Sequence, residues 1–516
     1  MKLKIDDELS THYEQLLQQE KNLQLEREFA LNCATSLLSK GQIIHQSLRG
    51  ESLGKRFIEV ARIMKHRKQS PYLNYFREGA KKAKTAEQLL KVVALSEEQQ
   101  FDDIPYMKAV AKKAAQLGQL DIAIQYLTRM LAAKETFEQA FHLSVYYLLD
   151  GNKQQAKVWH DKAMALYDDK QHENFFTKDG YRKYIVRKTA DYTLEFYKWR
   201  GEARGAIAAF DTIELTHKQG IFAKYYVNNQ QLDIVAFRRN RLNYFYENVT
   251  QAQYAQMTQP IFAQYAQNYA YGTSLAGYSA VYFGAVIPNV RILAFAPRNS
   301  GHPHYGAKRN IDFGHVLQLP TVEAPVTLLL DPKNTLDWQY YNEQLKPALK
   351  NVQFIPVPYS GHRVLRYLKE TGVLRKTYET FFNHEAVSLG DAHKKRSASP
   401  EYFSILAEQL VAHKHYRWAV TASDRALSLL PAFDRALYHK AVALKALGRL
   451  EEAAEALEQA LAAKTTLIKV TYLLTDIYNE LGNAKRSVAL LKKLSKRHRS
   501  KSLTNRLNKA KALRDA

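Results

Sequence analysis

The sequence predicts a central α/β domain with a mostly parallel sheet, placed between N-terminal and C-terminal arrays of antiparallel helices. Two patterns in the 516 residues indicate this fold class. In both outer parts, small residues recur in helical segments at a period of about 34 residues. Between these parts, short apolar runs alternate with helical segments, as in parallel strands joined by helices. The length allows about three domains.

The composition limits the cellular setting. Cys33 is the only cysteine, so no intrachain disulfide can form, which favours a reducing compartment. The first residues lack the apolar core of a signal peptide. The most apolar segment, 275–290, is shorter than the ~20 residues of a membrane span. We therefore expect a cytoplasmic protein.

The net charge is +24, and the C-terminal end carries a large share of it. From Lys485 onward there are 12 Lys and Arg residues against one acidic residue, Asp515. A solvated helical surface explains this charge most simply, and a polyanion or an anionic membrane surface is the alternative partner. No zinc-finger spacing, RNA-recognition motif or heptad-linked basic region accompanies it, so we expect no specific nucleic-acid module.

The N-terminal part is predicted to be helical throughout. Residues 1–69 form an N-terminal helical segment, because 9–38 is amphipathic and contains no glycine or proline. Residues 70–215 are predicted to form helical hairpins, in which Gly118 and Gly151 mark turns at a similar period.

The C-terminal part, 401–516, carries the clearest repeat and ends in the basic tail. Small residues lie where two antiparallel helices must approach closely: Ala441, Gly448, Ala453 and Ala460. The equivalent positions about 34 residues away are Ala407, Lys414, Ala419 and Ala426 on one side, and Thr475, Gly482, Ser487 and Leu494 on the other. Residues 400–502 therefore resemble tetratricopeptide repeats, and 70–215 resemble them more weakly. This resemblance implies a protein partner.

Residues 216–384 show a different pattern of short apolar runs. The predicted strands are 221–227, 232–237, 268–272, 291–297, 326–330 and 352–357. The predicted helices are 251–266, 274–287, 338–349 and 362–384. This alternation favours a parallel sheet covered on both faces. Residues 385–400 are polar and rich in small residues, which indicates a linker.

The stretch YGTSLAGYSA, residues 271–280, joins a predicted strand to a predicted helix at Ser274. A turn this tight forces the serine into strained backbone angles and needs small residues at Gly272 and Ala276. The stretch resembles the nucleophile elbow of α/β-hydrolases, with alanine in place of the second glycine. The helix N-terminus favours negative charge, and the Leu275 backbone N–H is a candidate oxyanion donor. Alternatively, Ser274 only caps the helix.

Two further features support a catalytic interpretation of Ser274. His362 follows the last predicted strand in a Ser-Gly-His turn. Asp331 ends the preceding strand, and Asp337 lies six residues later. Serine, then acid, then histidine is the chain order of α/β-hydrolases. We expect Asp331 to pair with His362, with Asp337 as the alternative acid.

Some of the expected parts are missing or weak. Asn334 stands where many α/β-hydrolases have the acid, and no glycine-rich oxyanion loop is visible. The loop that begins at Arg238 is therefore the candidate for a second oxyanion donor. His304 and Lys308 are candidates for binding an anionic substrate, although a solvated loop is the simpler explanation of these residues. No metal site or cofactor is expected, because no ligand cluster or nucleotide-binding motif is present.

The sequence thus predicts a serine hydrolase, of esterase or acyl-transfer type, that acts on a small-molecule or glycan ester. The helical repeats would recruit a partner or substrate. The architecture resembles that of bacterial proteins linked to surface-polysaccharide assembly. The alternative is a non-catalytic tetratricopeptide scaffold with a degenerate hydrolase domain, and Asn334 favours that alternative.

Overall fold

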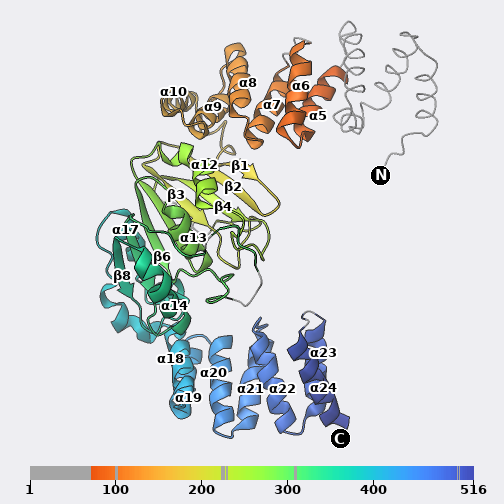
Figure 1. Ribbon diagram of the computed structural model, residues 1–516, viewed down its shortest axis with the longest axis vertical. Coiled ribbons are helices and arrows are strands. Elements are labelled where there is room, and N and C mark those ends of the chain that lie inside the picture. The colour runs from red at the N-terminus through yellow and green to blue at the C-terminus, as the bar shows by residue number, and fades with distance from the viewer. Residues whose placement is uncertain are drawn as a thin grey trace, which may run out of the picture.

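The computed structural model describes residues 71–98, 103–221, 227, 230–306, 311–315, 317–496, 498 and 500–515. The predicted helical segment at 1–69 lies outside these residues. The described chain forms a helical array, a sheet domain and a second helical array, with the sheet domain in the middle (Figure 1). Within the described ranges, every helix is too short or too polar to cross a membrane.

The N-terminal array consists of antiparallel helices that each pack on the next. Its helices are α5 (Pro71–Lys82), α6 (Ala86–Glu98), α7 (Ile104–Gln116), α8 (Leu120–Ala133), α9 (Phe137–Leu149) and α10 (Lys153–Ala165). The turns after α7 and α9 use Gly118 and Gly151, whose φ angles of +78° and +87° suit glycine. The array is joined to the sheet domain where α7 packs against strand β1 (Tyr181–Lys188) and α9 against helix α12 (Gln251–Phe262).

The central domain is built on an eight-stranded mixed sheet in the order β1-β2-β4-β3-β5-β6-β7-β8. Its strands are β1 (Tyr181–Lys188), β2 (Tyr192–Trp199), β3 (Gly205–Phe210), β4 (Leu232–Arg239), β5 (Asn268–Thr273), β6 (Val290–Phe295), β7 (Val326–Leu330) and β8 (Val352–Pro356). β2 pairs antiparallel with β1 and β4, and all other pairs are parallel.

Residues 181–210 correct the expected domain boundary at 216. They form β1, β2 and β3, where helical repeats were predicted. The alanine-rich β3, GAIAAF, has the composition of a helix, but it is fully buried and helix α13 (Leu275–Gly284) packs across it. Small side chains there allow the close approach of a helix to a buried parallel strand. The expected strand at 221–227 falls mostly on residues that the structure does not describe.

Helices cover both faces of the sheet. They are α12 (Gln251–Phe262), α13 (Leu275–Gly284), α14 (Thr335–Tyr340), the π-helical turn Tyr341–Leu345, α15 (Lys346–Ala348), α16 (Val364–Glu370) and α17 (Leu374–Phe382). A Cβ on Gly284 of α13 would lie 3.2 Å from the Ala270 Cβ of β5. On the other face, Tyr271 of β5 packs against Tyr378 of α17, with ring centroids 5.4 Å apart.

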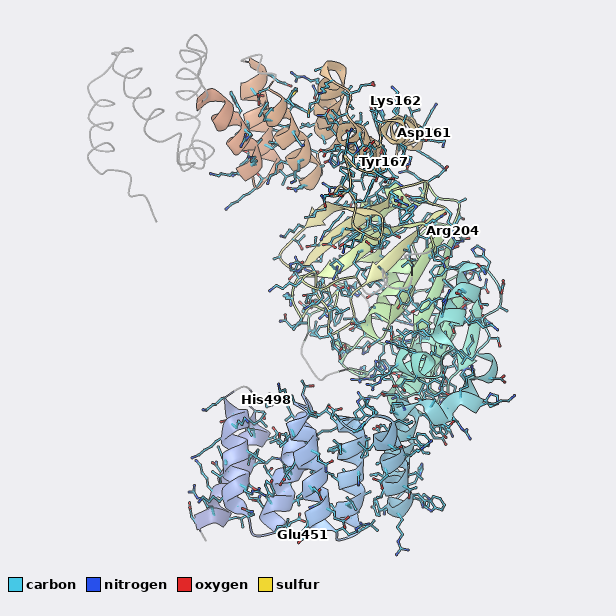
Figure 2. The ribbon with its side chains drawn as sticks, turned by 180° about the vertical axis from the view of Figure 1, so that it is seen from behind. Asp161, Lys162, Tyr167, Arg204, Glu451 and His498 are labelled. Atoms are coloured by element: carbon cyan, nitrogen blue, oxygen red, sulfur yellow. The ribbon has the colours of Figure 1, made fainter. Side chains whose placement is uncertain are left out.

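The C-terminal array repeats at the expected spacing. After a 3₁₀ segment at Gly390–Ala398 come α18 (Pro400–Ala412), α19 (Tyr416–Leu429), α20 (Asp434–Ala446), α21 (Leu450–Ala462), α22 (Ile468–Glu480), α23 (Ala484–Ser495) and α24 (Lys501–Asp515). The predicted crossing residues Ala407, Ala441 and Ser487 are fully buried. Figure 2 places His498 on the edge of this array that faces the central domain, and Glu451 on the opposite edge.

Candidate active site

Ser274 lies at a sharp turn between β5 and α13. Its φ of 54° and ψ of −122° are strained for any residue with a side chain, as the sequence predicted. Gly272 must be glycine, because a Cβ there would lie 2.1 Å from the Ala276 carbonyl oxygen. The turn places Ser274 at the carboxyl end of β5, at the edge of the sheet, and the Ser274 side chain is partly exposed.

Three side chains form a hydrogen-bonded chain at this edge. Ser274 Oγ lies 2.8 Å from His362 Nε2, and His362 Nδ1 lies 2.8 Å from Asp337 Oδ2. Asp337 is buried, whereas the His362 side chain is 27% exposed. The Ser274 side chain makes no hydrogen bond to α13. Ser274 therefore does not cap this helix through its side chain, which was the alternative interpretation.

The expected pairing of Asp331 with His362 is wrong. Asp331 is fully buried. Its Oδ1 accepts a hydrogen bond from Lys333 N at 2.8 Å, and its Oδ2 accepts one from Gly361 N at 2.8 Å. Burial raises the pKa of the Asp331 carboxyl, and these backbone donors oppose that rise. Asp331 therefore ties the strand end to the loop that carries His362.

Asn334 is the N-cap of α14. The Asn334 Oδ1 accepts from Asp337 N at 3.1 Å at the start of α14. This cap places Asp337 in the first turn, from which its carboxylate reaches His362. Asn334 is therefore no sign of a lost acid.

Arg298 is a member of the site that the sequence did not indicate. It follows β6, and its Nε lies 3.2 Å from Asp337 Oδ1. Its backbone N–H donates to the Ser274 carbonyl oxygen at 3.1 Å. Arg298 thus contacts both ends of the hydrogen-bonded chain. The sequence PRN after a strand carries no motif that would have revealed this.

The backbone offers donors for an oxyanion beside Ser274. Leu275 is the first residue of α13, so its N–H has no partner within the helix. β3 lies next to β5, with Ala209 opposite Tyr271, so the segment from Thr212 leaves the sheet beside the elbow. In α/β-hydrolases a loop that follows a strand supplies the second oxyanion donor.

Arg238 does not begin the loop that was expected to supply this donor. β4 continues through Arg239, and β3 separates β4 from β5. The Arg238 side chain is buried, with its Nε 2.7 Å from Asp211 Oδ1. Burial lowers the pKa of Arg238, but the carboxylates of Asp211 and Glu195 raise it overall.

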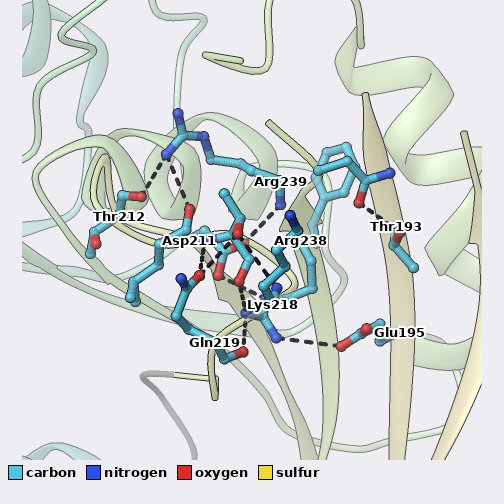
Figure 3. A network of polar contacts seen from close by, with 12 residues as sticks. Thr193, Glu195, Asp211, Thr212, Lys218, Gln219, Arg238 and Arg239 are labelled. Atoms are coloured by element: carbon cyan, nitrogen blue, oxygen red, sulfur yellow. Dashed lines mark hydrogen bonds and ion pairs between the residues drawn. The ribbon is translucent and has the colours of Figure 1, made fainter. Parts of the chain in front are cut away.

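Arg238 and Arg239 instead hold the segment after β3 (Figure 3). Arg238 Nη2 donates to the carbonyl oxygens of Thr216 at 2.7 Å and Gln219 at 2.8 Å. Arg239 Nη1 donates to Thr212 O at 2.8 Å. These charge-assisted bonds fix a loop that has no regular secondary structure.

The predicted substrate-binding residues are described in part. His304 is exposed, and its ring contacts are with His302 and Tyr305, at centroid distances of 5.7 Å and 6.3 Å. Burial lowers the pKa of the neighbouring His302. Lys308 lies outside the described residues. Within those residues, no group of three or more potential metal-binding side chains is present.

The comparisons with known proteins bear first on the C-terminal array. Residues 434–466 match the family model of the tetratricopeptide repeat. This range covers α20 and α21, one tetratricopeptide hairpin of the array. No curated protein sequence matches the chain.

Two solved structures resemble the chain in part. The alpha/beta hydrolase domain-containing protein 10 from mouse is 16% identical, covers 39% of this chain and 98% of its own, and has a TM-score of 0.29. The yeast Tom70 is 12% identical, covers 94% of this chain and 96% of its own, and has a TM-score of 0.24. Likenesses at this level carry no argument about function.

Proposed function

We propose that the central domain is a serine hydrolase of esterase or acyl-transfer type. The observation that carries this proposal is the hydrogen-bonded chain from Ser274 through His362 to Asp337, with Ser274 in a strained strand-to-helix turn. A nucleophile, a base in contact with it and a carboxylate that orients the base are the parts that acyl transfer requires.

The proposed reaction follows from these contacts. Ser274 Oγ attacks the acyl carbon while His362 Nε2 accepts its proton, and the same proton then passes to the leaving alcohol or amine. Asp337 holds the Nδ1 proton and stabilises the imidazolium. The oxyanion binds the Leu275 N–H and a second backbone N–H, which we assign to the segment that follows β3. Water or an acceptor alcohol releases the acyl group in the second step.

The alternative function, a non-catalytic scaffold, was favoured by one observation in the sequence. This observation was that Asn334 occupies the position of the acid. Asn334 caps α14, however, and the carboxylate of Asp337 is hydrogen-bonded to His362. The tetratricopeptide hairpin at 434–466 supports a role in protein–protein interaction, which we propose for the whole C-terminal array. We extend the same proposal to the helices at 71–165. A glycan ester from surface-polysaccharide assembly stays a prediction of the sequence alone.

The test is hydrolysis of short-chain p-nitrophenyl esters by the purified chain. We expect turnover that is lost in Ser274→Ala and in His362→Ala. Full activity in both variants would overturn the proposal.

A further inference from the structure

The loop that carries His362 packs against the first helix of the C-terminal array. Gly361 has a φ of +59°, and a Cβ there would lie 2.6 Å from Ile405 Cδ1 on α18. The Tyr359 ring meets the Tyr402 ring of α18 edge-on, with centroids 5.9 Å apart. Ile405 and Tyr402 are both buried. Helix α18 is therefore one wall of this loop.

The helix that follows His362 is joined to the same array by charged groups. Glu370, at the end of α16, accepts from Ser399 Oγ at 2.6 Å and from Glu401 N at 3.1 Å. Arg366 of α16 lies 2.9 Å from a Glu370 oxygen and 3.4 Å from a Glu401 oxygen. α16 is thus fixed at the N-terminus of α18.

Helix α20, the first helix of the next pair, is joined to α16 and α18 through Glu401. Arg435 of α20 lies 3.4 Å from the other Glu401 oxygen, and Arg366 lies over the Phe433 ring at 4.6 Å. Burial raises the pKa of the Glu401 carboxyl, and Arg435 and Arg366 oppose that rise. A buried carboxylate is strongly destabilised when its partners leave, so α16, α18 and α20 are held as one unit.

A cavity of about 210 Å³ lies at the same junction, lined among others by Asp331, Gly361, Ile405 and Glu408. The loop is therefore not packed tightly on every side. Ile405 fills the space directly against Gly361, and its loss would leave the residue before His362 free to move into the cavity.

We propose that α18 positions His362, so that Ile405 is a positioning residue for the hydrolase centre and the C-terminal array is part of the active-site support. This inference rests on the proposed function. The side chain of Ile405 acts through Gly361, which it holds in the backbone conformation that brings His362 Nε2 to Ser274 Oγ.

The experiment compares matched isoleucine deletions in the full chain. In Ile405→Ala we expect kcat on an activated ester to fall by about tenfold to a hundredfold, with a smaller change in KM, because misplacing a reacting group by ~1 Å has an effect of this size. Ile405→Val should keep most of the activity. The control is Ile477→Ala, a fully buried isoleucine in α22, which should keep the kcat of the wild type.

Each outcome decides the proposal. An unchanged kcat in Ile405→Ala, or an equal loss in Ile477→Ala, would overturn it. If Ile405→Ala does not fold, Tyr402→Leu removes the ring contact with Tyr359 instead; a lower kcat supports the proposal and an unchanged one overturns it. Reaction of wild-type Ser274 with a fluorophosphonate distinguishes failure of this inference from failure of the proposed function. Labelling at equal rates in wild type and Ile405→Ala defeats only this inference, whereas no labelling of the wild type defeats the proposed function.

Discussion

Ser274 and His362 are 88 residues apart in the chain, yet Oγ of the serine lies 2.8 Å from Nε2 of the histidine. The parallel sheet produces this contact, because β5 and β8 end at the same edge. The other ring nitrogen of His362, Nδ1, is hydrogen-bonded to the Asp337 carboxylate. A histidine oriented on one side and bonded to a strained serine on the other is the arrangement of an activated nucleophile.

Replacement of Ser274 by alanine should abolish ester hydrolysis without unfolding the domain. We expect kcat to fall by about 10⁴-fold or more, because the nucleophile is removed. The matched control is Ser279→Ala, whose buried hydroxyl on the same helix donates to Leu275 O at 3.0 Å. Ser279→Ala should keep the activity, and equal losses in both variants would argue for a packing effect.

The two aspartates should differ in what their replacement removes. Asp337→Asn should lower kcat by about 10⁴-fold, because the amide neither fixes the productive tautomer of His362 nor stabilises its charged form. Asp331→Asn should mainly lower the free energy of unfolding, by about 1–3 kcal/mol, since its carboxylate accepts backbone N–H groups. Kinetics and urea titration of both variants check this, and the opposite pattern would contradict the assignment of Asp337.

Gly272 should tolerate no side chain. Gly272→Ala places a Cβ 2.1 Å from the Ala276 carbonyl oxygen, so the elbow must shift or the fold must weaken. We expect the free energy of unfolding to fall by about 3 kcal/mol or more, with loss of activity. Gly220→Ala is the control, because no atom lies within 4 Å of its Cβ position. Equal thermal stability of the two variants would disprove the crowding argument.

His439 should make the C-terminal array sensitive to acid. Burial, with smaller contributions from the charges of Lys469 and Arg435, lowers its pKa from the ordinary 6.5 to about 3. The unfolded chain therefore binds a proton more readily than the folded chain. The stability gained above pH ~6.5 is lost progressively as the pH falls toward ~3. Between pH 7 and 4.5, wild type should lose about 2–3 kcal/mol more than His439→Gln in urea unfolding. Parallel losses in both proteins would contradict this.

The basic C-terminal end should bind polyanions through charge alone. Lys492, Lys493, Lys509 and Lys511 lie on α23 and α24, and their replacement by glutamine should weaken retention on heparin. The affinity of the wild type should fall steeply between low and physiological salt. Retention that does not depend on salt, or that the four replacements leave unchanged, would refute this prediction.

The sequence predicted the parts of the fold that depend on local patterns. The spacing of Ala407 and Ala441, both fully buried, determines how the C-terminal helices cross. Gly448 lies in the turn between α20 and α21 with a φ of +77°, and Gly272 with Ser274 determines the turn between β5 and α13. These features are set by contacts within a few residues, or within one repeat unit, so they can be recognised along the chain.

The parts that the sequence did not predict depend on distant contacts. β3 is rich in alanine because α13 crosses it, and that helix lies more than 60 residues later. The choice between Asp331 and Asp337 depends on which carboxylate the His362 loop reaches in space. Arg298, which follows β6, acquires its place only when the fold brings Asp337 of α14 within 3.2 Å of its side chain. None of these relationships has a fixed spacing in the sequence.

The most direct test of the central claim is reaction of the intact wild-type chain with a fluorophosphonate, followed by mass spectrometry of its peptides. Only a serine that a neighbouring base activates reacts readily. We expect one adduct, on the peptide that contains Ser274, which is absent in Ser274→Ala and strongly reduced in Asp337→Asn. No adduct on the folded wild type, or an adduct that persists in Ser274→Ala, would contradict it.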